Sequence, residues 1–193
     1  GAVRFISGTY HAHIQLEAEL AAFHGREETM IFSSAYATIM GTISPLITAE
    51  TGVISDELNH NCIINAIRMA RPKEKAVYPH LDMGSLDQSL TEFKNRVDRV
   101  LVITDGIFSM RGDHAPMDEI MALAQKHDGD FPENVVVIMD DSHGVGAFGD
   151  TGRGTEEYTA APPVDVLVGT LGKAFGVNGG YVTSNGALIR FLR

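Results

Sequence analysis

Two spacings of apolar residues alternate along this sequence, and each predicts a different kind of element. In residues 11–24, Leu16, Leu20 and Phe23 recur at helical spacing, and Gly25 follows as a stop signal. Residues 99–106 (RVLVITDG) instead form a short run of continuous aliphatic side chains, the pattern of a strand buried on both faces. The alternation of these two patterns carries the prediction of the fold.

The same analysis assigns most of the chain. Helices are predicted at residues 11–24, from about residue 35, and at 59–70, 85–97, 115–127 and the C-terminal tail. Strands are predicted at residues 29–34, 52–56, 75–80, 99–106, 135–141, 164–170 and 179–184. Alternating helices and strands predict an α/β domain with three layers, α/β/α, around a mainly parallel central sheet.

Composition narrows the class of protein. The 193 residues are 44% hydrophobic and 21% charged, as in an ordinary soluble globular domain. The net charge is −10 and there is no basic tract, so we expect no nucleic-acid partner. No apolar run is long enough to cross a membrane, and no metal site is predicted. The single cysteine, Cys62, favours a reducing cytoplasm, and its apolar surroundings predict a buried structural thiol.

Polar residues follow three of the predicted strands, in the segments TDGIFSM, DDSH and GTLGK. Ligands of α/β sheets bind at the carboxyl ends of the strands, so these segments are the candidate site. Gly144, Gly146 and Gly149 have the spacing of a dinucleotide fingerprint, but four polar residues (140–143) separate the aliphatic run from Gly144. The segment that follows Gly149 is predicted to be a glycine-rich loop. A phosphate loop at GTLGKAFG fails because Leu167 stands where glycine is required. An NAD-binding oxidoreductase is therefore a minor alternative.

A pyridoxal phosphate (PLP) enzyme needs a reachable lysine, a carboxylate for the ring nitrogen and a donor for the ring oxygen. Lys173 lies among small residues after a strand, and its alternative is a solvated loop lysine. Asp140 ends an aliphatic strand, where a cationic ring nitrogen would offset the cost of burying its carboxylate. Asp141 could instead cap a turn. His143 could bond the ring oxygen, or be a structural histidine.

Two helix starts complete the pattern. His60 precedes an apolar-periodic helix, where it could stack on a ring or be an ordinary helix N-terminal residue. Residues 33–36 (SSAY) follow a strand and open a helix, where a phosphate could bind the helix N-terminus. The alternative there is a plain serine cap.

In this order and on these strand ends, the motifs resemble the α-oxoamine synthase family of fold-type I PLP enzymes. The similarity runs along essentially the whole chain, and its most diagnostic segments are DDSHGVG and GTLGKAFG. It implies that the aldehyde of PLP bonds to Lys173, that Asp140 pairs with the pyridine nitrogen, that His143 donates to the ring oxygen, and that His60 stacks on the ring.

The resemblance also implies roles for four further residues. Ser109 matches a hydroxyl beside the ring oxygen, Thr170 matches a phosphate ligand, and Ala35 and Tyr36 match backbone N–H donors to the phosphate. The family commonly has glycine where Ala35 stands, asparagine where Thr38 stands and an acid where Arg111 stands. The first two departures lie where the family's backbone approaches the phosphate, and the third replaces an acid with a base after Ser109.

The implied reaction is a Claisen-type acyl transfer from an acyl-CoA to an amino acid in a homodimer. Residues 1–193 match the PLP-binding large domain, and the ends at GAVRFISGTYH and ALIRFLR predict a fragment without the family's N-terminal segment and C-terminal small domain. RFISGT and TGRGTEEY favour the branch that condenses glycine with acetyl-CoA to 2-amino-3-ketobutyrate. GDHAP is as close to the 8-amino-7-oxononanoate branch, which uses alanine and a pimeloyl thioester. A non-catalytic partner subunit is disfavoured because Lys173 is present.

Overall fold

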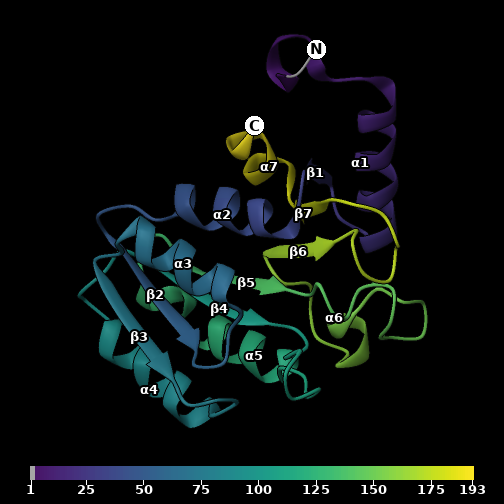
Figure 1. Cartoon of the computed structure of the whole chain (residues 1–193). Helices are drawn as coiled ribbons and strands as arrows, with labels where there is room; N and C mark the ends of the chain where they lie inside the picture. Colours follow the sequence, from purple (N-terminus) through teal and green to yellow (C-terminus); the bar gives the residue numbers. More distant parts are fainter. Residues whose placement is uncertain (1–2) are drawn as a thin grey trace.

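The computed structural model describes residues 3–193, in which a seven-stranded sheet lies between helical layers (Figure 1). The strands are Glu28–Phe32 (β1), Thr51–Asp56 (β2), Glu74–Tyr78 (β3), Arg99–Asp105 (β4), Val135–Asp140 (β5), Val166–Thr170 (β6) and Gly180–Ser184 (β7). The α-helices are His11–His24 (α1), Ala35–Leu46 (α2), Asn61–Ala70 (α3), Met83–Phe93 (α4), Met117–His127 (α5), Thr155–Tyr158 (α6) and Gly186–Leu192 (α7). The predicted three-layer α/β/α fold is confirmed.

The order of the strands places the candidate segments at one edge of the sheet. The order is β1-β7-β6-β5-β4-β2-β3. Strand β7 runs antiparallel to both of its neighbours, β1 and β6, and all other neighbouring strands are parallel. The sheet is therefore mainly parallel, as predicted. The carboxyl ends of β2, β4, β5 and β6 consequently meet at the same edge of the sheet.

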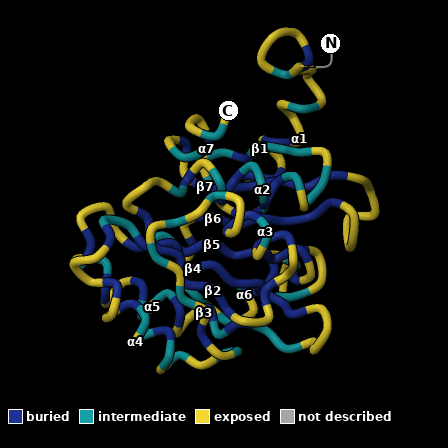
Figure 2. The backbone as a smooth tube through the Cα atoms, turned by 60° about the vertical axis from the view of Figure 1, so that its left-hand side comes forward, coloured by how far each residue is buried: buried dark blue, intermediate teal, exposed yellow. Residues whose placement is uncertain are grey.

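Each face of the sheet has its own core. Along β4, Val100 and Val102 belong to the core under α4 and α5, whereas Leu101 and Ile103 belong to the core under α2 and α3. The side chains of a strand alternate between its faces, so a strand covered on both sides needs apolar residues at every position. Figure 2 shows the central strands as buried along almost their whole length. This explains the continuous aliphatic run in the sequence.

Two predicted segments differ from the structure. The predicted helix 85–97 ends at Phe93. The N–H of Lys94 donates to the carbonyl of Thr91, three residues earlier, and the chain turns at Asn95, whose φ is +62°. The loop predicted after Gly149 contains the single-turn helix α6. This helix begins where the N–H of Thr155 donates to Asp141, a partner 14 residues away. A local sequence pattern does not reveal such a distant cap.

Two short helical turns complete the secondary structure. Arg4–Gly8 (η1) forms a π-helical turn ahead of α1, near the N label of Figure 1, and Asp128–Asp130 (η2) is a 3-10 turn after α5. The Arg4 guanidinium lies 2.6 Å from Glu17 of α1, which joins the turn to the helix. Within residues 3–193, no helix combines the length and the apolar character needed to cross a bilayer.

Candidate active site

One cavity lies at the carboxyl ends of the central strands and collects most of the predicted site residues. Its walls come from the start of α2, the turn into α3, and the loops after β4, β5 and β6. The lining residues are Ala35, Tyr36, His60, Cys62, Asp105, Ser109, Asp140, Ser142, His143 and Lys173. Seven of the eight predicted site residues are therefore brought together, and Thr170 is not among the lining residues.

Asp140 ends β5 and is only 6% exposed. Its Oδ1 atom accepts hydrogen bonds from the N–H (3.1 Å) and the hydroxyl (2.6 Å) of Ser142. Its Oδ2 atom has the Cys62 sulfur 4.0 Å away. A thiol at this distance is a weak donor, so Oδ2 keeps the capacity to accept a stronger hydrogen bond from a ligand.

Asp105 is a second buried carboxylate that the sequence analysis did not single out. It ends β4 directly opposite Asp140 in the sheet register, and the backbone N–H of His60 donates to it over 2.9 Å. Burial, and then the charge of Asp140, raise the pKa of Asp105 to about 8. The sequence signal was its position at the end of an aliphatic strand, the same signal that identified Asp140.

The surroundings of Asp105 and Asp140 indicate whether a protonated PLP ring would fit the site. Neither Asp105 nor Asp140 forms an ion pair with a side chain in the part of the chain that the structure describes. Burying acids without a cation is costly, and a protonated ring nitrogen beside them would offset this cost. The residues present therefore fit a pyridinium ring at the floor of the cavity.

The neighbouring acid, Asp141, supports the loop. It is fully buried, and its two oxygens accept the N–H (2.7 Å) and the hydroxyl (2.5 Å) of Thr155. Burial raises the pKa of Asp141 to about 7. The predicted capping alternative for this residue is thus confirmed.

The glycines after Asp141 pack this loop. A Cβ on Gly144 would lie 2.2 Å from Asp141 Oδ1, and one on Gly146, whose φ is +80°, would lie 2.6 Å from the Cβ of Ala174. The motif that imitates a dinucleotide fingerprint therefore allows the loop to approach the segment that carries Lys173.

Lys173 lies in the turn between β6 and β7. Backbone hydrogen bonds from Val177 to Leu171 (2.9 Å) and from Gly176 to Lys173 (3.0 Å) hold this turn. Partial burial lowers the pKa of Lys173, although Asp140 and Asp105 act in the opposite direction. A lysine with a lowered pKa supplies more of the neutral amine at a given pH, which nucleophilic and proton-transfer chemistry require.

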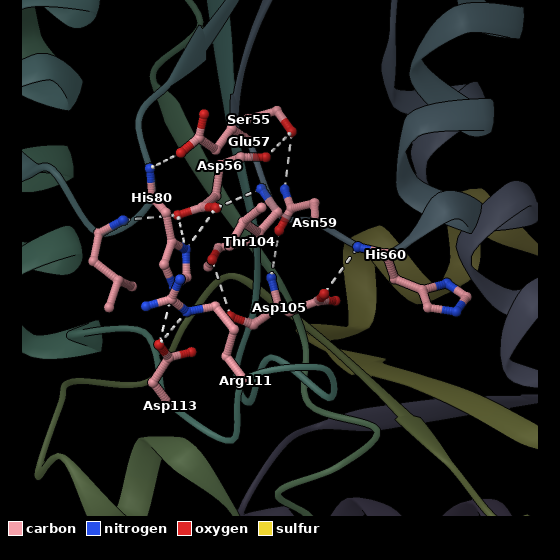
Figure 3. Close-up of polar contacts among 12 residues, drawn as sticks. Ser55, Asp56, Glu57, Asn59, His60, His80, Thr104, Asp105, Arg111 and Asp113 are labelled. Atoms are coloured by element: carbon pink, nitrogen blue, oxygen red, sulfur yellow. Dashed lines mark hydrogen bonds and ion pairs between the residues drawn. The ribbon is translucent and has the colours of Figure 1, made fainter.

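Two histidines line the cavity. Partial burial, and then Lys173, lower the pKa of His143. His60 is the N-cap of α3, where its Nδ1 atom accepts the N–H of Cys62 over 3.2 Å. Through its Nδ1 atom, His60 is therefore a helix N-terminal residue, as the alternative predicted. Its ring also lines the cavity, and in Figure 3 it points away from the neighbouring polar cluster. Stacking on PLP stays a prediction.

Cys62 lies deeper in the same wall. It is buried, as predicted, and its burial raises the pKa of the thiol to about 12. It remains a neutral thiol near pH 7 and gives the cavity an apolar, compact surface beside Asp140.

The start of α2 offers backbone donors. Ser34 caps the helix by accepting the N–H of Ala37 over 3.1 Å, which confirms the serine-cap alternative. The N–H groups of Ala35 and Tyr36 lie in the first turn, where they have no partner within the helix and where the helix dipole favours an anion. Both residues line the cavity, and their binding of phosphate stays a prediction.

Thr170 lies just outside the lining. It ends β6 and is 7% exposed, and its hydroxyl donates to the carbonyl of Gly179 (3.3 Å) and accepts the N–H of Gly172 (3.1 Å). In these contacts it shapes the turn that carries Lys173. Its role as a phosphate ligand stays a prediction.

Comparison with known proteins gives a family. The family described as Aminotransferase class I and II matches residues 2–193. The chain is 42% identical to 8-amino-7-oxononanoate synthase 1 of Bacillus subtilis (100% of this chain and 47% of that protein). It is 44% identical to the mitochondrial 2-amino-3-ketobutyrate coenzyme A ligase of Homo sapiens (99% of this chain and 44% of that protein).

A solved structure supports the same grouping. Serine palmitoyltransferase of Sphingomonas wittichii matches with a TM-score of 0.89 and 32% sequence identity, over 98% of this chain and 46% of that one. The chain thus spans about half the length of the relatives it matches. The three relatives are all α-oxoamine synthases, in agreement with the motifs in the sequence. The chain therefore belongs to the aminotransferase class I and II family, and within it to the α-oxoamine synthases.

Proposed function

We propose that this chain forms the PLP-binding part of an α-oxoamine synthase, an enzyme that transfers an acyl group from an acyl-CoA to the α-carbon of an amino acid. The observation that carries the proposal is the convergence of Lys173, Asp140 and His143 on one cavity at the carboxyl ends of the strands. Structures of serine palmitoyltransferase with a TM-score of 0.89 to this chain are described as containing PLP. The minor alternative of an NAD-dependent oxidoreductase has no comparable support.

Each residue has a task in this chemistry. PLP, when bound, supplies an aldehyde that captures an amine and a ring that withdraws electrons from the adjacent carbon. The buried carboxylate of Asp140 would keep the ring nitrogen protonated. Lys173, whose pKa is lowered by burial, would capture the aldehyde and later remove the α-proton of the amino acid. His143 would donate to the ring oxygen.

The remaining contacts would orient the cofactor. The ring of His60 would cover one face of PLP, and the hydroxyl of Ser109 would lie beside its ring oxygen. The N–H groups of Ala35 and Tyr36 would bind the phosphate at the start of α2, with Thr170 at the other side of the phosphate. These assignments follow the resemblance and the placement of all but Thr170 on the cavity lining.

We further propose glycine and acetyl-CoA as substrates and 2-amino-3-ketobutyrate as product. RFISGT and TGRGTEEY support this choice. Identities of 44% to the 2-amino-3-ketobutyrate ligase and 42% to the 8-amino-7-oxononanoate synthase do not separate the branches. Alanine with a pimeloyl thioester is therefore the second candidate, supported by GDHAP.

The working enzyme is proposed to be a cytoplasmic homodimer with its active site at the interface. Because the chain covers less than half of the relatives' length, an N-terminal segment and a C-terminal small domain are proposed to complete the substrate site. A substrate-carboxylate arginine is expected in that small domain.

Release of free CoA tests the function. The longer protein proposed above, purified and supplied with PLP, is incubated with glycine or alanine and with acetyl-CoA or pimeloyl-CoA in all four pairings. The released thiol is measured with a chromogenic disulfide. Glycine with acetyl-CoA is expected to give the fastest release, and Lys173→Ala to abolish it. Release only with alanine and pimeloyl-CoA would select the second candidate. No release from any pair, in protein that has bound PLP, would contradict the proposed acyl transfer.

A further inference from the structure

A buried histidine outside the cavity connects two of its walls. His80 follows β3, and its side chain is 9% exposed. Its Nδ1 atom lies 3.0 and 3.2 Å from the two carboxylate oxygens of Asp56, and its Nε2 atom lies 3.3 Å from Asp113 Oδ2 (Figure 3). Each ring nitrogen thus lies within hydrogen-bonding distance of a different acid, one on β2 and one in the loop after β4. His80 therefore bridges two acids that come from different segments of the chain.

The Asp56 end of the bridge holds the turn that leads to His60. Asp56 is buried at the end of β2 and also accepts the N–H groups of Leu58 (2.8 Å) and Leu81 (3.1 Å). The next residue, Glu57, accepts the backbone N–H of His80 over 2.9 Å. Residues 56–58 are thus fixed directly by the segment around His80. His60 follows two residues later and lines the cavity.

Asn59 ties the same turn to the central sheet. Its amide nitrogen donates to the carbonyl of Ile103 over 2.7 Å, and its amide oxygen accepts the N–H of Asp105 over 2.8 Å. Asp105 in turn accepts the N–H of His60. Figure 3 shows a continuous series of contacts from His80 to His60 at the cavity wall, which passes through Asp56, Ser55, Asn59 and Asp105.

The Asp113 end of the bridge holds the loop after β4. The backbone carbonyl of Asp113 accepts the N–H of Phe108 over 2.9 Å, and the Phe108 ring packs edge-on against His80 with centroids 4.4 Å apart. Burial acts to raise the pKa of Asp113, but hydrogen bonds from Arg111 and His80 lower it. Ser109, the next residue after Phe108, lines the cavity.

We propose that His80 is a positioning residue, which bridges Asp56 and Asp113 and so fixes the spacing between the turn carrying His60 and the loop carrying Ser109. The inference rests on the proposed function only for the identity of the ligand in the cavity. The bridge itself consists of side chains of this chain and orders the two walls before any ligand binds.

The chain provides a matched control in His127, at the end of α5. It is also buried between two acids, with Nε2 2.6 Å from Asp87 and Nδ1 3.2 Å from Asp130. It does not line the cavity. His127→Gln therefore breaks the same kind of bridge without touching either wall.

Hydrogen exchange of the cofactor-free protein tests the proposal without requiring activity. In His80→Gln, the amides of residues 106–115 and 57–60 are expected to exchange about tenfold faster, because the variant loses hydrogen bonds to charged partners. His127→Gln should leave both segments at the wild-type rate. Unchanged exchange in His80→Gln, or equal acceleration in His127→Gln, would overturn the inference.

Two further measurements complete the test. One uses a second variant in case His80→Gln does not fold, and the other separates the role of His80 from the proposed function. Asp113→Asn weakens the bridge from its more exposed end, and it should accelerate exchange in the same two segments; unchanged exchange there would also count against the bridge. Titration with PLP, followed by absorbance, should show weaker binding by about tenfold in His80→Gln and wild-type binding in His127→Gln. If the wild-type protein binds no PLP, the proposed function fails while the exchange experiment still decides the role of His80.

Discussion

Replacing Asp141 with alanine tests the claim that Asp141 supports the loop while its neighbour, Asp140, faces the cofactor. Asp141 is fully buried, and both of its oxygens accept hydrogen bonds from Thr155, which is itself fully buried. The substitution leaves the N–H and the hydroxyl of Thr155 without their partner, at about 1–3 kcal/mol for each group. Their sum is about 2–6 kcal/mol.

One effect reduces this cost. Burial raises the pKa of Asp141 to about 7, which shows that its ionised form is itself penalised in the folded protein. Removing that carboxylate relieves the penalty, so the lower half of the range, about 2–4 kcal/mol, is the expected loss in the free energy of unfolding. Unfolding in urea, followed by circular dichroism, measures it.

Asp150, which lies in the same loop and is exposed, is the control. Asp150→Ala should change the free energy of unfolding by less than about 0.5 kcal/mol. If Asp141→Ala also stayed within that range, the assignment of Asp141 to loop support would be wrong. Asp140→Asn should behave in the opposite way: it should weaken PLP binding while it changes the urea midpoint little, because the hydrogen bonds from Ser142 can be kept.

Three further substitutions have expected outcomes. Because burial raises the pKa of Asp105 to about 8, the folded, cofactor-free protein keeps a proton that the unfolded chain releases near pH 4. The stabilising effect of this retained proton is complete below pH 4 and is lost as the pH rises to 8. The free energy of unfolding of Asp105→Asn, relative to that of the wild type, should therefore increase with pH by up to about 1.4 kcal/mol per pH unit in urea titrations. A difference that does not change with pH would contradict this prediction. Gly169→Ala should cost about 1–3 kcal/mol, because the new Cβ would lie 2.4 Å from the buried Tyr181 ring; an unchanged urea midpoint would refute this. Ala160→Gly should raise the melting temperature slightly, because Ala160 is exposed with φ +52°; a decrease would contradict the strain argument.

The fold was largely predictable because its signals are local. The continuous aliphatic residues of β4 and β5 reflect burial on both faces, and Gly25 ends α1 in the left-handed conformation that glycine adopts readily. The start of α6 depends instead on Asp141, 14 residues earlier, and the end of α4 depends on a turn at Asn95. Those contacts do not appear in the spacing of apolar positions.

The candidate site was predictable where polar residues directly follow strands. Asp140, His143 and Lys173 carry this signal, and the structure places them on one cavity. Asp105 has the same position on β4, but its partnership with Asp140 depends on the order of the strands. The bridge of His80 was not predictable, because Asp56, His80 and Asp113 are 24 and 33 residues apart and meet only in the folded chain.

The central claim is that Lys173 holds PLP in this cavity. The most direct measurement is to record the visible spectrum of the protein purified with PLP, reduce it with borohydride, digest it and map the modified peptide. The account predicts a yellow absorption band that disappears on reduction, and a pyridoxyl group on Lys173 within the GTLGKAFG segment. No such band and no label on this peptide would contradict the account.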